Sequence, residues 1–150
     1  MRLRVSWLTI GLAAVAAVAL VACAVDIQAR MQGEIDGLLP EGARKSGECN
    51  WASGFVENAP ASLACRYLLD GDLASVGRMM AERLHARGYA FQPAERASGA
   101  PTAWLVAGRN SDYFASIGLV APGDPLDWQL NETPVPPATV GIFVHVTERR

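Results

Sequence analysis

An uncharged apolar segment lies at the start of the chain. Residues Val5–Val25 contain no charged side chain, and Arg2 and Arg4 precede them. As a helix with a rise of about 1.5 Å per residue, this segment would be about 30 Å long, which is the hydrocarbon thickness of a bilayer. The arginines before it and Asp26 after it favour a cytoplasmic N-terminus. We therefore predict a signal or anchor segment over residues 1–25, with the rest of the chain outside the cytoplasm.

The apolar spacing that follows predicts a helix over Asp26–Leu39. Four apolar residues share one stripe of this helix: Ile27, Met31, Ile35 and Leu38. Their spacings of four, four and three residues match the helical period, and Pro40 and Gly42 end the helix. Its polar face is mixed, not basic, which argues against a helix lying on the membrane surface. We interpret residues 26–48 as a helical stalk, with one stripe docked on the domain, and a linker.

Periodic patterns after residue 48 predict one extracytoplasmic domain over residues 49–150. Ser62–Leu69 alternates in the period of a strand. Leu73–Arg87 has the clearest helical pattern, and Asp72 before it can accept hydrogen bonds from the free amides of the first turn. The apolar stripe of this helix comprises Leu73, Val76, Met80 and Leu84, and further strands are expected at Tyr89–Gln92, Thr102–Arg109, Tyr113–Val120 and Ala138–Val146. We therefore predict an α+β fold, in which a small antiparallel sheet carries one main helix on one face.

A short motif at the end of the apolar segment indicates how the chain is anchored. The sequence Leu20-Val21-Ala22-Cys23 resembles the lipobox, the signal of bacterial lipoproteins, over residues 1–23 alone. The resemblance implies a bacterial cell envelope location and a diacylglycerol on the Cys23 thiol. In one alternative the segment stays as a transmembrane helix, which the unbroken helical pattern after it supports. In another, signal peptidase cleaves at Ala22-Cys23-Ala24 and releases the protein.

Two cysteines remain once Cys23 is set aside. Cys49 and Cys65 would lie in an oxidising compartment, where an even number of thiols indicates a disulfide. Closing a loop of about 16 residues would stabilise the fold by about 3 kcal/mol if the effect is on chain entropy. A metal site is not expected, because His85 and His145 are isolated in the sequence.

Charge and motifs restrict the function. Without Arg2 and Arg4, the exported part has 11 basic and 15 acidic residues, a net charge of −4. This balance argues against nucleic acid, which is bound mainly by phosphate neutralisation, and against broad adhesion to anionic lipid. The sequence contains no G-x-S-x-G, H-E-x-x-H, P-loop or dinucleotide motif. We therefore expect no enzyme activity and no cofactor.

The connection Ala121–Pro137 is the strongest indication of a partner surface. Loops longer than about 12–15 residues are uncommon in compact domains and are usually functional or disordered. This one carries five prolines and an apolar tip formed by Leu126, Trp128 and Leu130. We predict that the tip contacts an envelope protein, the alternative being that Trp128 covers the protein's own sheet.

These observations favour a membrane-tethered, non-enzymatic interaction module, such as an accessory subunit, adaptor or inhibitor. Two other functions stay open on the sequence alone. One is a small-ligand-binding protein or an enzyme whose site is assembled from scattered residues. The other is a purely structural lipoprotein.

Overall fold

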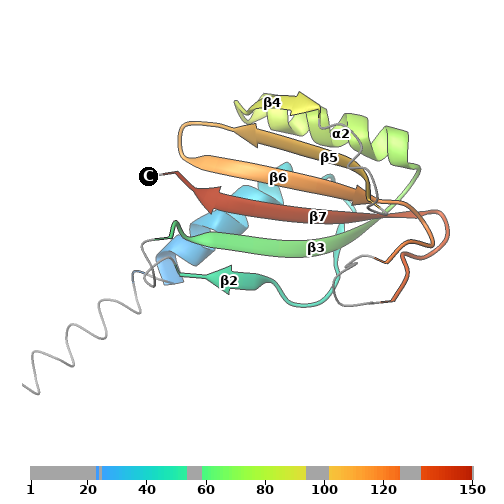
Figure 1. Cartoon of the computed structure of the whole chain (residues 1–150), viewed down its shortest axis with the longest axis horizontal. Coiled ribbons are helices and arrows are strands. Elements are labelled where there is room, and N and C mark those ends of the chain that lie inside the picture. Colours follow the sequence, from blue (N-terminus) through green and yellow to red (C-terminus); the bar gives the residue numbers. More distant parts are fainter. Residues whose placement is uncertain (1–22, 24, 54–58, 94–101, 126–132, 150) are drawn as a thin grey trace, which may run out of the picture.

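The computed structural model describes residues 23, 25–53, 59–93, 102–125 and 133–149. In them the chain forms a helix over residues 25–38, here called the N-terminal helix, the helix α2 (Leu73–Ala86) and one sheet (Figure 1). The strands are β1 (Arg44–Lys45), β2 (Asn50–Ala52), β3 (Ser62–Asp70), β4 (Ala90–Pro93), β5 (Thr102–Arg109), β6 (Tyr113–Val120) and β7 (Thr139–Glu148). None of the helices in these ranges is long and apolar enough to cross a membrane. Most of the predicted anchor segment lies outside the described residues.

The seven strands form one antiparallel sheet in the order β1-β3-β7-β6-β5-β4, with β2 also paired to β3. The last strand of the chain, β7, lies in the middle of the sheet. Its Val144 is paired with Cys65 of β3 on one side and with Ile117 of β6 on the other. The predicted α+β class and antiparallel sheet are therefore confirmed.

Local sequence explains the two best-defined elements. In β3 the residues Leu63, Cys65, Tyr67 and Leu69 are buried, and the residues between them are partly exposed. Helix α2 begins after Asp72, whose Oδ1 accepts a hydrogen bond of 2.9 Å from the Ser75 amide. It ends before Gly88, which has a φ of +74°. Residues with a side chain rarely adopt this angle. Alternation, an N-cap and a glycine stop thus locate these elements in the sequence.

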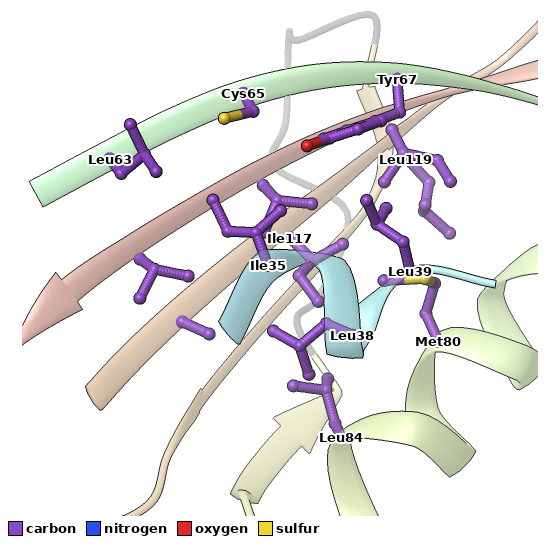
Figure 2. Close-up of a cluster of buried hydrophobic side chains, with 14 of the residues drawn as sticks. Ile35, Leu38, Leu39, Leu63, Cys65, Tyr67, Met80, Leu84, Ile117 and Leu119 are labelled. Carbon is purple, nitrogen blue, oxygen red and sulfur yellow. The ribbon is translucent and has the colours of Figure 1, made fainter. Parts of the chain in front are cut away.

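Two helices, not one, cover the same face of the sheet (Figures 1 and 2). Met31, Ile35 and Leu38 of the N-terminal helix are fully buried. They belong to the same core as Met80 and Leu84 of α2 and the inward residues of the strands. The predicted single main helix is therefore incomplete, because the apolar stripe of the expected stalk forms part of the core.

The segment expected as a linker contributes to the sheet. Arg44 and Lys45 of β1 pair with Leu68 and Tyr67 of β3. Strands of two or three residues are too short to show a period, so their pattern is not visible in the sequence.

Cys49 and Cys65 form the predicted disulfide, with their Cα atoms 4.4 Å apart. Cys49 precedes β2, and Asn50 is paired with Ala64, so the two cysteines face each other across the strand pair. The side-chain oxygen of Gln32 lies 3.7 and 3.8 Å from the two sulphur atoms. Bonded sulphurs have no hydrogen to donate, so this is a packing contact that brings the N-terminal helix against the disulfide.

Candidate functional site

The face of the sheet opposite the helices is only partly covered. Successive side chains of a strand point to opposite faces, so the residues that alternate with the buried ones form this surface. Phe114 of β6 is its most exposed large apolar residue, with 43% of its surface accessible. We call this surface the open face and define it by Ala64, Arg66, Arg109, Phe114, Ser116, Phe143, His145 and Thr147. In the described part of the chain, both helices lie on the other side of the sheet.

Strand register arranges the open face in rows. His145 lies between two small residues, Ala64 of β3 and Ser116 of β6. Phe143, the next outward residue of β7, has Gly118 on one side. Arg66 of β3 lies on its other side, and both Phe143 and His145 are partly buried.

Charged side chains lie on the open face and at its edge. Arg66 and Arg109 contribute one positive charge each, and Arg44 at the edge strand pairs with Asp70. The guanidinium of Arg44 donates hydrogen bonds of 3.0 and 2.8 Å to the two carboxylate oxygens of Asp70. These bonds lower the pKa of Asp70, so its charge is present and neutralised. Asp70, at the end of β3 beside the open face, is therefore already paired.

Burial determines the charge state of His145. Desolvation lowers the pKa of its imidazole below the ordinary value of 6.5. The ring is therefore neutral at pH 7 and presents an aromatic, hydrogen-bonding group at the centre of the open face.

The long connection after β6 covers one end of the open face. Val135 is buried against Val120 and Leu68. The amide of Gly123 donates to the Val135 carbonyl, and the amide of Val135 donates to the Asp124 carbonyl, both at 2.9 Å. The two arms of the connection therefore form an ordered stem. Its predicted tip, with Leu126, Trp128 and Leu130, lies outside the described residues, and its role stays a prediction.

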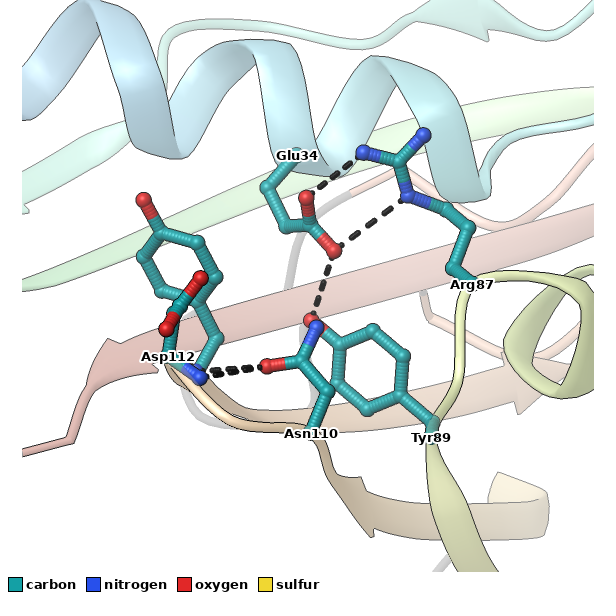
Figure 3. A network of polar contacts seen from close by, with 6 residues as sticks. Glu34, Arg87, Tyr89, Asn110 and Asp112 are labelled. Carbon is teal, nitrogen blue, oxygen red and sulfur yellow. Dashed lines mark hydrogen bonds and ion pairs between the residues drawn. The ribbon is translucent and has the colours of Figure 1, made fainter.

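A second polar cluster lies on the helical side and joins three elements (Figure 3). Glu34 of the N-terminal helix is 9% exposed. Arg87 donates to both carboxylate oxygens, with distances of 2.6 and 3.3 Å, and the Tyr89 hydroxyl donates at 2.9 Å. Burial raises the pKa of Glu34. The hydrogen bonds from Arg87 and Tyr89 and the charge of Arg87 lower this pKa by a larger amount, so it lies below its ordinary value.

These contacts give the cluster a structural role. The Glu34 carboxylate is ionised and already accepts three hydrogen bonds, so it is poorly suited to take a proton from a substrate. Burial also raises the pKa of Tyr89 well above its usual range, and its hydroxyl stays a donor. The cluster therefore fastens the N-terminal helix to the end of α2.

The predicted lipidation residue Cys23 and the two histidines lie in different parts of the structure. Cys23 is a free, exposed cysteine. Its lipidation stays a prediction. His85 is exposed beside a shallow depression that Gly88, Tyr89 and Ala90 also line, whereas His145 lies on the opposite side of the sheet. Over the residues that the structure describes, no three His, Cys, Asp or Glu side chains are placed to hold a metal ion.

The alternating pattern in the sequence indicates the strands but not the open face. Phe143 and His145 alternate with the buried Ile142, Val144 and Val146, and this alternation was a usable signal. Which face the helices cover depends on long-range topology. Comparison of the chain with protein families, with curated proteins and with solved structures finds no match.

Proposed function

We propose that this protein is a membrane-tethered interaction module whose open face binds a protein of the bacterial cell envelope. The observation that carries the proposal is the accessible Phe114, which lies with Phe143 on a sheet face that the two helices leave uncovered. Apolar side chains grouped on an exposed surface are typical of protein interaction sites. Large aromatic residues also contribute much of the affinity in such sites.

The sheet offers this surface in a fixed shape. Strand β7 is paired along its length with β3 and β6, so the backbone beneath Phe143 and His145 is held on both sides. A preformed surface loses little conformational entropy when a partner binds. The stem around Val135 fixes one border of the open face in the same way.

The tether would keep the open face close to the membrane. Met31 is the first fully buried residue of the N-terminal helix, eight residues after Cys23. Eight helical residues extend over about 12 Å, so a lipid on Cys23 would hold the domain near the headgroups. Confinement at this distance raises the effective concentration for a partner in the same membrane.

Two experiments on the full chain test this proposal. The first labels cells with a fatty-acid probe, and Cys23→Ala should abolish the label and accumulate the precursor. An unlabelled wild-type protein that retains residues 1–22 would instead establish the transmembrane alternative.

The second experiment compares two exposed apolar residues on opposite sides of the molecule. Phe114→Ser should weaken binding of the envelope partner about thirty-fold, as expected for an aromatic residue contributing about 2 kcal/mol. Met79→Ser on α2, where the side chain is 37% exposed, is the matched control and should bind normally. Both variants should keep the melting temperature of the wild type. Equal binding by the two variants contradicts the proposal.

A further inference from the structure

We infer that the Cys49–Cys65 disulfide is a reversible redox site, which exchanges with a dithiol through the sulphur of Cys49. The site is separate from the open face, because Cys65 belongs to the core on the side of the sheet that the helices cover. Two of its features support the inference: the position of the Gln32 amide and the unequal exposure of the two cysteines.

The first feature is an amide oxygen placed beside both sulphurs. Gln32 Oε1 lies 3.7 Å from Cys49 Sγ and 3.8 Å from Cys65 Sγ. The Nε2 group of the same amide donates to Asp36 Oδ1 at 2.7 Å and to the Tyr67 hydroxyl at 3.1 Å. These bonds fix which end of the amide faces the sulphurs, because only the nitrogen can donate to a carboxylate.

The amide oxygen is suited to the reduced pair. In the disulfide neither sulphur carries a hydrogen, and Gln32 Oε1 accepts no hydrogen bond from another residue in the described ranges. Reduction places a hydrogen on each sulphur, and a thiol is a weak donor. Either thiol can then donate to Oε1 without a turn of the amide. Gln32 therefore stabilises the reduced form relative to the disulfide.

The second feature is the unequal exposure of the two cysteines. Cys65 is fully buried in β3. Cys49, directly before β2, is only partly buried. Thiol–disulfide exchange begins when a thiolate reaches one of the two sulphurs. The sulphur that it can reach in the folded protein is that of Cys49.

The exchange consists of two displacements. A thiolate of the dithiol attacks Cys49 Sγ and forms a mixed disulfide, while Cys65 Sγ leaves with the electron pair of the broken bond and takes a proton. The second thiolate of the dithiol then attacks its own partner sulphur in the mixed disulfide and releases Cys49, which is also protonated. The dithiol loses two electrons and becomes a disulfide, and the protein gains two electrons and two protons.

Reduction changes the attachment of β2 and leaves the centre of the sheet intact. Strand β2 is paired with β3 through three residue pairs, and the disulfide is the covalent link at its start. Strand β3 keeps its nine residue pairs with β7 in either redox form. The bond therefore controls how firmly β2 is held to β3.

Redox titration of the full chain in detergent tests the role of Gln32. The protein is equilibrated with mixtures of reduced and oxidised dithiothreitol, and alkylation with mass spectrometry measures the thiols at positions 49 and 65. Gln32→Met removes the acceptor and should lower the equilibrium constant for reduction about five-fold, the effect of one net hydrogen bond. Gln32→Glu keeps an acceptor and should not lower it. Gln28→Met, at an exposed position of the same helix, is the matched control and should leave it unchanged. Equal constants for the wild type and Gln32→Met overturn the inference.

A monothiol identifies the sulphur that exchanges. The wild-type chain is incubated with reduced glutathione and quenched with acid, and peptide mapping locates the mixed disulfide. At least ten times more glutathione should be found on Cys49 than on Cys65, because the buried sulphur is out of reach. Equal amounts on the two cysteines, or reduction that occurs only in denaturant, would overturn exchange through Cys49 in the folded protein.

Discussion

Glu34 and Arg87 are 53 residues apart in the sequence and form an ion pair, with Arg87 Nη2 2.6 Å from Glu34 Oε2. The pair joins the N-terminal helix to the residue that ends α2. Tyr89, directly before β4, donates to the other carboxylate oxygen. Because all three hydrogen bonds come from one short stretch, this stretch holds the N-terminal helix in place.

Removing the guanidinium should destabilise the fold. Arg87→Met leaves the buried Glu34 carboxylate without its cation, and breaking a buried pair in this way costs about 3–5 kcal/mol. The Arg87 side chain is 38% exposed, so water moderates the loss and we expect about 2–3 kcal/mol. Urea denaturation measures the difference.

The control for this prediction is Arg78→Met, because Arg78 is an exposed arginine of the same helix. It should change the free energy of unfolding by less than about 0.5 kcal/mol. The double variant Glu34→Leu, Arg87→Met should recover part of the loss, since no buried charge remains. Equal stability of Arg87→Met and Arg78→Met would show that the pair does not hold the helix.

Two glycines of the N-terminal helix should respond to alanine in opposite ways. Alanine in a helix interior is more favourable than glycine by about 1 kcal/mol. At Gly33 an added Cβ has no atom within 4 Å, so Gly33→Ala should stabilise the protein by about 0.5–1 kcal/mol. At Gly37 the Cβ would overlap the guanidinium of Arg87, which must move away from Glu34. Gly37→Ala should therefore be neutral or destabilising, and thermal melts of both variants measure the difference.

The role of Arg87 in this effect can be isolated. In an Arg87→Met background, the atom that Gly37→Ala would displace is absent. The two alanine substitutions should then have the same sign. If Gly37→Ala stabilises the wild type as much as Gly33→Ala does, close contact with Arg87 is not what requires glycine at this position.

Local pattern predicted the central elements well. The expected strand Ser62–Leu69 and helix Leu73–Arg87 differ from β3 and α2 by one residue at their ends. Both have a full period of alternation or of helical spacing and a clear start or stop signal. The disulfide followed from counting cysteines and from the expected compartment. The strand and the helix are features that near neighbours in the sequence determine.

What escaped prediction depends on residues far apart in the chain. Glu34 was visible only as a polar residue of a stalk, and nothing local indicates its pairing with Arg87. The open face also depends on distant residues. The sequence shows that Phe143 and His145 alternate with apolar residues, but it does not show which face of the sheet the helices cover. Only the crossing of the chain that places β7 between β3 and β6 decides which residues are buried.

Loss of the disulfide should weaken the fold to a predictable extent. Cys49 and Cys65 close a loop with a separation of 16 residues. Replacing both with alanine should cost about 2–4 kcal/mol, because the unfolded chain regains the entropy of the open loop. Denaturation of the full chain in detergent measures the loss. Cys23→Ala is the matched control and should leave the domain's stability unchanged, and mass spectrometry without reductant should find no thiol at positions 49 and 65.

Acidification should destabilise the fold through His145. Burial lowers the pKa of this side chain in the folded protein below 6.5, so between the two pKa values the unfolded chain binds more protons. The free energy of unfolding should therefore fall as the pH decreases from about 7 through 6.5 and then through the folded pKa. Denaturation at a series of pH values measures this slope. Within that window His145→Gln should flatten it, whereas His85→Gln, at an exposed position of α2, should preserve it. A slope that persists in His145→Gln would show that another group binds the protons.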